Sequence, residues 1–199
     1  MKVWTSVGSP PSKTIHYVLK KFSIEHEQGM KETFEARTEK YKKEVNAKGQ
    51  IPVIEIEGGY KLTQSRAILA YLLTTFDKDN TLLPRDDPVQ MAKVDELFDI
   101  QSTWLQSKCQ TAMTEIAVNP FMKGADPPTE ERKKELLEEV SAAFQILEDS
   151  FGEGKYFTGD DLTIADIQMY NQVLMYTRWI GADITTFEKV NGWFKLLAE

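Results

Sequence analysis

The chain has few of the residues that bind metals or form disulfides. Cys109 is its one cysteine, so no internal disulfide can form and dithiol redox chemistry is excluded. His16 and His26 are its two histidines, so the usual ligands of a structural zinc site are missing. We therefore expect no bound metal and no cofactor, and we expect Cys109 to be an inert core thiol.

Long apolar runs and excess positive charge are also lacking. No apolar run is long enough to cross a bilayer, so we expect no membrane partner. The 24 basic and 31 acidic residues give a net charge of −7, which repels polyphosphate and argues against a nucleic-acid partner. The densest basic run, Lys40-Tyr41-Lys42-Lys43, lies between Glu39 and Glu44 and is typical of a solvated helical face. The N-terminus has no apolar segment of signal-peptide length, which favours a cytoplasmic location.

Two parts of the chain follow different patterns. Residues 1–77 alternate short β-like runs with helical ones, which predicts an α/β domain. Residues 78–88 concentrate charge, asparagine and proline, as interdomain linkers do. Residues 89–199 carry apolar residues at helical spacing and predict an all-α domain. The predicted fold class is therefore α/β plus all-α.

Local signals place several elements. In the first part we expect strands at residues 2–5, 53–56 and 60–62, a helix over 15–22, and a weakly marked strand near 24–30. In the second part, Thr129 precedes a long amphipathic run and reads as its N-cap. Thr163 and Asp166 form a T-x-x-D pair, which predicts a capping box that serves folding.

The segment from Asn46 to Leu72 carries the clearest sign of a ligand site. Ile51-Pro52 enters an apolar run, and because proline cannot donate to a sheet ladder, it either caps an edge or has a cis bond. Gly58-Gly59 then marks a tight turn between two short strands.

A polar cluster, Thr63-Gln64-Ser65, stands where the next buried helix begins. Unpaired N–H groups and the helix dipole make such an N-terminus a good site for a carboxylate. The alternative is that Thr63 or Ser65 merely caps its own helix.

Together, Ile51-Pro52, Gln64-Ser65 and the later Leu162-Thr163-Ile164-Ala165-Asp166 resemble the cytosolic glutathione transferase family, over nearly the whole chain. The resemblance implies the glutathione transferase fold, in which a thioredoxin-like N-terminal domain precedes an α-helical C-terminal domain. It also implies a cis bond at Pro52 and a homodimer. The opening segment VGSPPSKTIHYVLK, residues 7–20, is similar to the serine-type active site of the theta and delta classes.

By this resemblance, Ser9 occupies the place of the catalytic serine, and its hydroxyl would donate a hydrogen bond to the thiolate of bound glutathione. Ser6 and Ser12 are the nearest rivals, and the alternative is that Ser9 is simply a turn residue. Ile51 would pair through its backbone with the cysteinyl part of glutathione. Further contacts would come from Pro52, from Gln64 and Ser65 at the γ-glutamyl end, and from Gln50 and Lys13 at the glycyl carboxylate. Gln64 departs from the glutamate more often found in the theta and delta classes.

Less specific signals concern the second substrate. The residues that could line a pocket for a hydrophobic electrophile are Val7, Pro10, Trp104, Leu105 and Trp179, although aromatic and aliphatic residues at helical spacing are more often plain core.

The function implied is conjugation of glutathione, a co-substrate, to hydrophobic electrophiles, with a role in detoxification. Two alternatives remain: a non-catalytic interaction module of the translation-elongation or regulatory type, and a glutathione-dependent peroxidase or isomerase.

Overall fold

The computed structural model describes residues 1–30 and 33–199. They divide into two compact units, unit 1 (Met1–Asp86) and unit 2 (Asp87–Glu199). Within the described residues, no helix combines the length and the apolar character needed to span a membrane.

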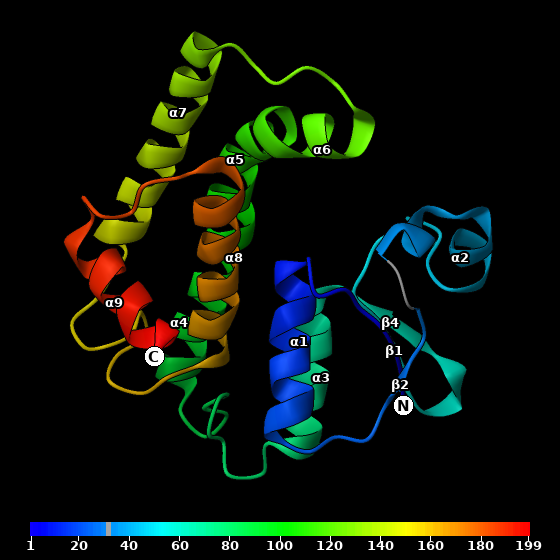
Figure 1. Ribbon diagram of the computed structural model, residues 1–199. Helices are drawn as coiled ribbons and strands as arrows, with labels where there is room; N and C mark the ends of the chain where they lie inside the picture. The colour runs from blue at the N-terminus through cyan, green and yellow to red at the C-terminus, as the bar shows by residue number, and fades with distance from the viewer. Residues whose placement is uncertain (31–32) are drawn as a thin grey trace. The chain divides into compact units, whose positions relative to one another are not determined.

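Unit 1 has the predicted α/β layout (Figure 1). Its elements are β1 (Lys2–Trp4), α1 (Pro10–Lys21), β2 (Glu27–Gln28), η1 (Thr33–Arg37), α2 (Glu39–Glu44), β3 (Val53–Glu55), η2 (Glu57–Gly59), β4 (Lys61–Thr63) and α3 (Ser65–Phe76). Helix α1 begins at Pro10, five residues before the predicted start, because prolines suit the first helical turn even though the apolar period becomes visible only from Ile15.

The four strands are ordered β2-β1-β3-β4. Strand β1 runs parallel to β2 and antiparallel to β3, which in turn pairs antiparallel with β4. In this register Trp4 faces Val53, and Val53 faces Thr63. The end of β1, the start of β3 and the end of β4 therefore coincide at one end of the sheet.

Side chains from the two sheet faces enter different cores. Trp4 and Val53 pack with Met30, Ala36 and Tyr41, which come from the β2–α2 region. Neighbouring strand residues point to opposite faces, so the fully buried Val3 and Ile54 lie on the other face, which α1 and α3 cover (Figure 1). At Gly29 an added Cβ would lie 2.5 Å from the Trp4 ring, so this position has no room for a side chain.

The segment predicted as a linker folds onto the end of α3. Asp77 is buried and accepts hydrogen bonds from the Thr81 amide and hydroxyl and from the amides of Leu82 and Leu83, at 2.8 to 3.3 Å. Arg85 donates to the carbonyls of Leu73 and Thr74 at 3.1 and 2.9 Å. Residues 78–86 therefore pack with unit 1.

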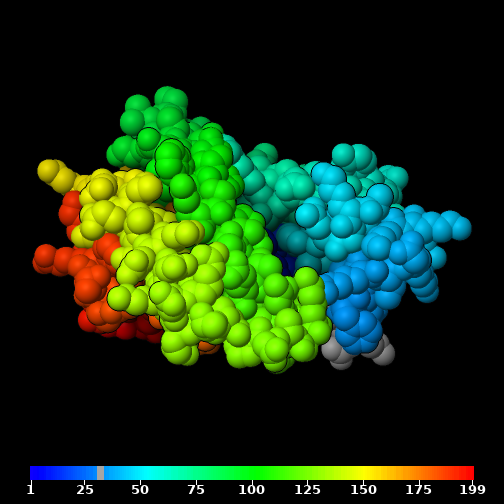
Figure 2. All heavy atoms as spheres, turned by 90° about the horizontal axis from the view of Figure 1, so that it is seen from above, coloured from blue at the N-terminus to red at the C-terminus, as the bar shows by residue number. Residues whose placement is uncertain are grey.

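Unit 2 is all helical, as predicted. Its elements are α4 (Pro88–Asp99), η3 (Ile100–Leu105), α5 (Gln106–Ala112), η4 (Met113–Val118), α6 (Asn119–Lys123), α7 (Glu130–Asp149), α8 (Ile164–Ile180) and α9 (Glu188–Ala198), and η3 and η4 are π-helical. Helix α7 packs along α5, and in the space-filling view its yellow-green atoms lie directly against the green ones of that segment (Figure 2).

The predicted capping box at the start of α8 is confirmed. Asp166 accepts from both the amide and the hydroxyl of Thr163, at 3.2 and 2.8 Å. Its other oxygen accepts from the Phe157 amide at 3.0 Å and from the Trp193 indole N–H at 3.2 Å. One carboxylate therefore joins the start of α8 to the preceding loop and to α9. The expected N-cap at Thr129 is also present, since its hydroxyl accepts from the Arg132 amide.

Candidate functional site

Three segments singled out in the sequence lie beside strand ends at the same end of the unit 1 sheet. Residues 5–9 follow β1, Ile51-Pro52 precedes β3, and Gln64-Ser65 follows β4. The pairing of Trp4, Val53 and Thr63 brings these strand ends into line. Segments nearly sixty residues apart in the chain are thus gathered at one edge.

The three candidate serines differ in exposure and in hydrogen bonding. Ser12 is fully buried and Ser6 is 7 % exposed, whereas Ser9 is partly exposed at the N-cap position of α1. The Ser6 hydroxyl accepts from the Gly8 amide at 3.3 Å, and the Ser6 carbonyl accepts from the Ser9 amide at 3.1 Å. Among the described residues, the Ser9 side chain caps no backbone N–H of α1. The Ser9 hydroxyl is therefore not committed to the helix that it precedes.

The start of α3 is a helix N-terminus without a side-chain cap. Gln64 is the N-cap residue, and within the described part of the chain its side chain makes no bond to the first turn. Its φ of 72° lies in the left-handed region, which a residue other than glycine rarely adopts. No acidic residue stands in the first turn of α3, so the positive end of the dipole is not offset from within the helix. The structure contradicts the alternative that Thr63 or Ser65 caps this helix, because Gln64 occupies the N-cap position.

The bond between Ile51 and Pro52 is cis, as the family resemblance implied. Just before it, the Gln50 carbonyl accepts from the Tyr41 hydroxyl at 3.0 Å and from the Asn46 side-chain amide at 2.9 Å. Ile51 packs partly against the core that contains Tyr41. The segment from Gln50 to Pro52 is therefore held by hydrogen bonds to the Gln50 carbonyl and by apolar packing of Ile51.

Tyr41 corrects the interpretation of the run Lys40-Tyr41-Lys42-Lys43 as a purely solvated face. The lysines are exposed or half-exposed, but Tyr41 is buried, and burial raises its pKa to about 12. Sequence reasoning missed it because charged neighbours mask a single apolar position in a helix of only six residues. Lys13 lies in the first turn of α1, where its amide donates to the Ser9 carbonyl at 3.0 Å.

The predicted electrophile-pocket residues have unequal exposure. In unit 1, Val7 is 79 % exposed while Pro10 is buried. In unit 2, Trp104 of η3 and Trp179 of α8 are 50 % and 45 % exposed. Leu105 is only 1 % exposed, so its side chain serves packing and has almost no surface to offer a ligand. The sequence did not separate Leu105 from Trp104 because both lie on the same apolar helical pattern.

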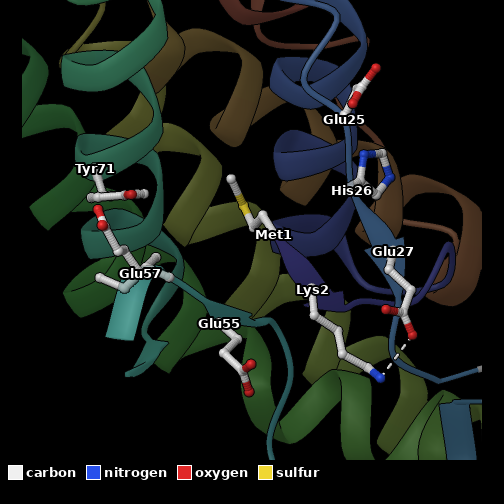
Figure 3. Close-up of a pocket in the computed structure, with 9 residues that line it drawn as sticks. Met1, Lys2, Glu25, His26, Glu27, Glu55, Glu57 and Tyr71 are labelled. Atoms are coloured by element: carbon white, nitrogen blue, oxygen red, sulfur yellow. Dashed lines mark hydrogen bonds and ion pairs between the residues drawn. The ribbon is translucent and has the colours of Figure 1, made fainter. Parts of the chain in front are cut away.

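A pocket of about 900 Å³ lies at the opposite end of the same sheet. Its lining includes Met1 and Lys2 of β1, Glu55 at the end of β3, and Glu25, His26, Glu27 and Glu57. Figure 3 shows the Lys2 ammonium paired with Glu27, at 2.9 Å. With four carboxylates and one lysine, this pocket repels an anionic peptide, unlike the end that carries Ser9 and Gln64.

Cys109 is fully buried in unit 2, and burial raises its pKa to about 12. A thiol with so high a pKa is protonated at neutral pH and is a poor nucleophile. This agrees with the expected inert core thiol.

Two family models match the chain. The model described as Glutathione S-transferase, N-terminal domain, matches residues 1–74, and the one described as Glutathione S-transferase, C-terminal domain, matches residues 109–199. Glutathione S-transferase D6 of Drosophila melanogaster is 24% identical over 196 residues, which cover 98% of this chain and 86% of that protein. Human glutathione S-transferase theta-1 is 31% identical over 146 residues, which cover 73% of this chain and 58% of that protein.

Solved structures agree on the fold. Apo human glutathione S-transferase T1-1 superposes with a TM-score of 0.87 at 23% identity, covering 98% of this chain and 82% of that one. Glutathione S-transferase 1-6 from Anopheles dirus species B gives 0.80 at 24% identity, with 99% and 88% covered. The predicted thioredoxin-like domain followed by an all-helical domain is confirmed.

Proposed function

This chain belongs to the glutathione S-transferase family, of the theta and delta kind, and we propose that it conjugates glutathione to hydrophobic electrophiles with the Ser9 hydroxyl stabilising the thiolate. The observation that carries the proposal is the gathering of Ser9, Ile51-Pro52 and Gln64-Ser65 at one end of the unit 1 sheet.

The chemistry begins with the thiol. A free cysteine thiol has a pKa of about 8.5, so only a few per cent is thiolate at neutral pH, and the thiolate is the nucleophile. A hydrogen bond donated by Ser9 to the charged sulfur contributes about 1.5 to 3 kcal/mol. At about 1.36 kcal/mol per unit, this lowers the thiol pKa by roughly one to two units. The pKa of the bound thiol is then about 7.5 to 6.5, so roughly a quarter to three quarters of it is thiolate at pH 7.

Binding uses the remaining parts of the site. Glutathione is a tripeptide with two carboxylates and one amine, so it is anionic. We assign its γ-glutamyl carboxylate to Gln64 and Ser65, where the uncapped α3 N-terminus favours an anion. The backbone of Ile51, next to Pro52, pairs with the cysteinyl residue, and Gln50 and Lys13 hold the glycyl carboxylate.

The electrophile adds at the sulfur, and the exposed side chain of Val7, in the same loop as Ser9, supplies apolar surface for it. Glutathione is consumed as a co-substrate. We further propose a homodimer, a cytoplasmic location and a role in detoxification, in keeping with the family.

Three measurements test the catalytic assignment. Calorimetry with glutathione should give saturable heat, and conjugation should be detected with a panel of aryl and alkyl halides. Ser9→Ala should lower kcat/KM by about 10- to 100-fold, since it removes a hydrogen bond to a charged group.

The matched control is Ser12→Ala, which deletes a buried hydroxyl three residues away and should leave kcat/KM within about twofold. Full activity in Ser9→Ala would remove the role of its hydroxyl. Absence of glutathione binding would instead indicate an interaction module, and turnover of hydroperoxides alone would indicate a peroxidase.

A further inference from the structure

The loop that carries Ser9 is bridged by a side-chain network. Thr5, directly after β1, is buried, and its hydroxyl oxygen lies 2.9 Å from Nε2 of His16 on α1. The same hydroxyl donates to Oε1 of Gln28 on β2, at 3.2 Å. Gln28 returns a hydrogen bond from Nε2 to the Thr5 carbonyl, at 2.9 Å. We name these three residues the Thr5 brace.

The proton positions in the brace follow from its geometry. The Thr5 hydroxyl has one proton, and that proton is donated to Gln28 Oε1. The contact between Thr5 Oγ1 and His16 Nε2 therefore needs a proton on the histidine nitrogen. His16 is accordingly the Nε2–H tautomer, and it donates to Thr5.

The brace encloses the Ser9 loop. Thr5 is the last residue before this loop, and His16 lies two turns into the helix that follows it. Inside the loop, the Ser6 carbonyl accepts from the Ser9 amide at 3.1 Å, and the Ser9 carbonyl accepts from the Lys13 amide at 3.0 Å. A movement of Thr5 relative to α1 must therefore displace Ser9.

We propose that Thr5, His16 and Gln28 are positioning residues that hold the Ser9 hydroxyl in register with the glutathione sulfur. The inference rests on the proposed function and adds to it. Reactivity depends steeply on this alignment, since a displacement of about 1 Å can cost on the order of 100-fold in rate.

A second histidine makes the brace sensitive to pH. The rings of His16 and His26 are 6.4 Å apart, and His26 binds the Ile24 carbonyl through Nδ1 at 2.9 Å. Burial, followed by the charge of His26, lowers the pKa of His16, and Glu25 and Glu27 flank His26 in the sequence. The lowered pKa keeps His16 in the brace neutral at pH 7, and acid adds a positive charge to its ring.

The test compares isosteric and donor-preserving variants. Thr5→Val removes the hydroxyl and keeps the shape, His16→Leu removes the donor, and His16→Gln keeps an N–H donor of similar reach but cannot titrate. His26→Gln is the matched control outside the brace. For each variant, kcat, KM for glutathione, the thiol pKa from the pH–rate profile, and amide hydrogen exchange over residues 6–9 are measured.

We expect Thr5→Val and His16→Leu to lower kcat by about tenfold and to raise the apparent thiol pKa, with KM for glutathione within about twofold. His16→Gln and His26→Gln should stay near the wild type at pH 7, and His16→Gln should lose less activity than the wild type in mild acid. A merely structural role would not shift the thiol pKa.

The possible outcomes distinguish a failure of the Thr5 brace proposal from a failure of the proposed transferase function. An active wild type with unchanged kcat and pH profile in Thr5→Val would overturn the brace and leave the transferase function standing. An inactive wild type would remove the function instead. In that case hydrogen exchange decides, because faster exchange over residues 6–9 in Thr5→Val supports the brace and unchanged exchange overturns it.

Discussion

Helices α1 and α3 of unit 1 differ at their starts from α4, α7 and α8 of unit 2. The short helix α2 of unit 1 is capped, since the Thr38 hydroxyl accepts from the Tyr41 amide at 3.2 Å. In unit 2, Asp87, Thr129 and the Thr163–Asp166 box cap α4, α7 and α8, and Glu148 of α7 accepts from two amides at the start of α9. In unit 1, among the described residues, neither α1 nor α3 has a side-chain cap or an acidic residue in its first turn.

Charge follows the same division. Residues 1–86 contain 14 basic and 11 acidic residues, a net of +3, whereas residues 87–199 contain 10 and 20, a net of −10. A capped helix start has used its donors for folding, while an uncapped one in a positive unit remains able to bind an anion. The comparison thus separates helix starts that are used for folding from those that we propose bind glutathione.

The largest expected effect is in unit 2. Asp166→Ala leaves four buried donors without an acceptor, among them the Trp193 indole N–H, and should lower the free energy of unfolding by about 3 to 4 kcal/mol. Urea denaturation measures this loss. The control Thr163→Ala removes only the cap hydroxyl and should cost about 1 kcal/mol. Equal losses in both variants would mean that Asp166 is no more than a local cap.

The role of the uncapped α3 N-terminus is tested by adding a carboxylate to its first turn. Ala67 is exposed in the first turn of α3, so Ala67→Glu should stabilise the fold by about 0.3 to 1 kcal/mol. The same charge should repel the glutathione carboxylate and raise its dissociation constant about tenfold. Calorimetry and thermal unfolding measure the two effects, with the neutral Ala67→Gln as control. Unchanged affinity in Ala67→Glu would place the anion elsewhere.

A smaller effect is expected from the left-handed backbone of Gln64. Gln64→Gly should raise the free energy of unfolding by about 0.5 to 1 kcal/mol because glycine adopts a φ of 72° without steric cost. It should also weaken glutathione binding. Ser23, with a φ of 50° in the turn after α1, is the matched position. Ser23→Gly should give a similar gain in stability with unchanged affinity, and a loss of affinity there would show that the effect is not local to the site.

The smallest expected effect is a difference between the two units in how their stability depends on pH. Burial raises the pKa of Asp77, but hydrogen bonds from Leu82, Thr81 and Leu83 outweigh it, so the folded pKa is lowered. The stability that Asp77 contributes is present above its unfolded pKa and is lost as pH falls through the folded value. Burial raises the pKa of Asp166 despite its four donors, so folding favours its protonated form and this carboxyl becomes less favourable as pH rises through its folded pKa.

His16 acts in the same direction as Asp77. Its lowered pKa means that its stabilising contribution is complete above its unfolded value and declines as pH falls towards the folded one. Hydrogen exchange during acid titration should therefore show unit 1 opening before unit 2. His16→Gln should remove the part of this loss that comes from the lowered pKa of His16. Opening of unit 2 first would contradict the assignment of these groups.

The candidate site residues could be named from the sequence because their signals are local. Gln64-Ser65 before a buried helix and Ser9 before two prolines are each readable within a few residues. Local patterns did not distinguish the buried Tyr41 and Leu105 from their exposed neighbours. The first is a lone buried position among lysines, and the second shares its apolar pattern with the exposed Trp104.

Capping, turn and periodicity signals depend on neighbouring residues, so they were enough to predict the two-part fold, the caps at Thr129 and Thr163, and three candidate site segments. Tertiary structure alone decided that these segments meet, because the register of Trp4, Val53 and Thr63 is set by pairing between distant strands. Tertiary structure also decided which polar groups form hydrogen bonds within the fold. The hydroxyl of Thr5 and the carboxylate of Asp166 find partners across the fold, while among the described residues α1 and α3 begin without a side-chain cap.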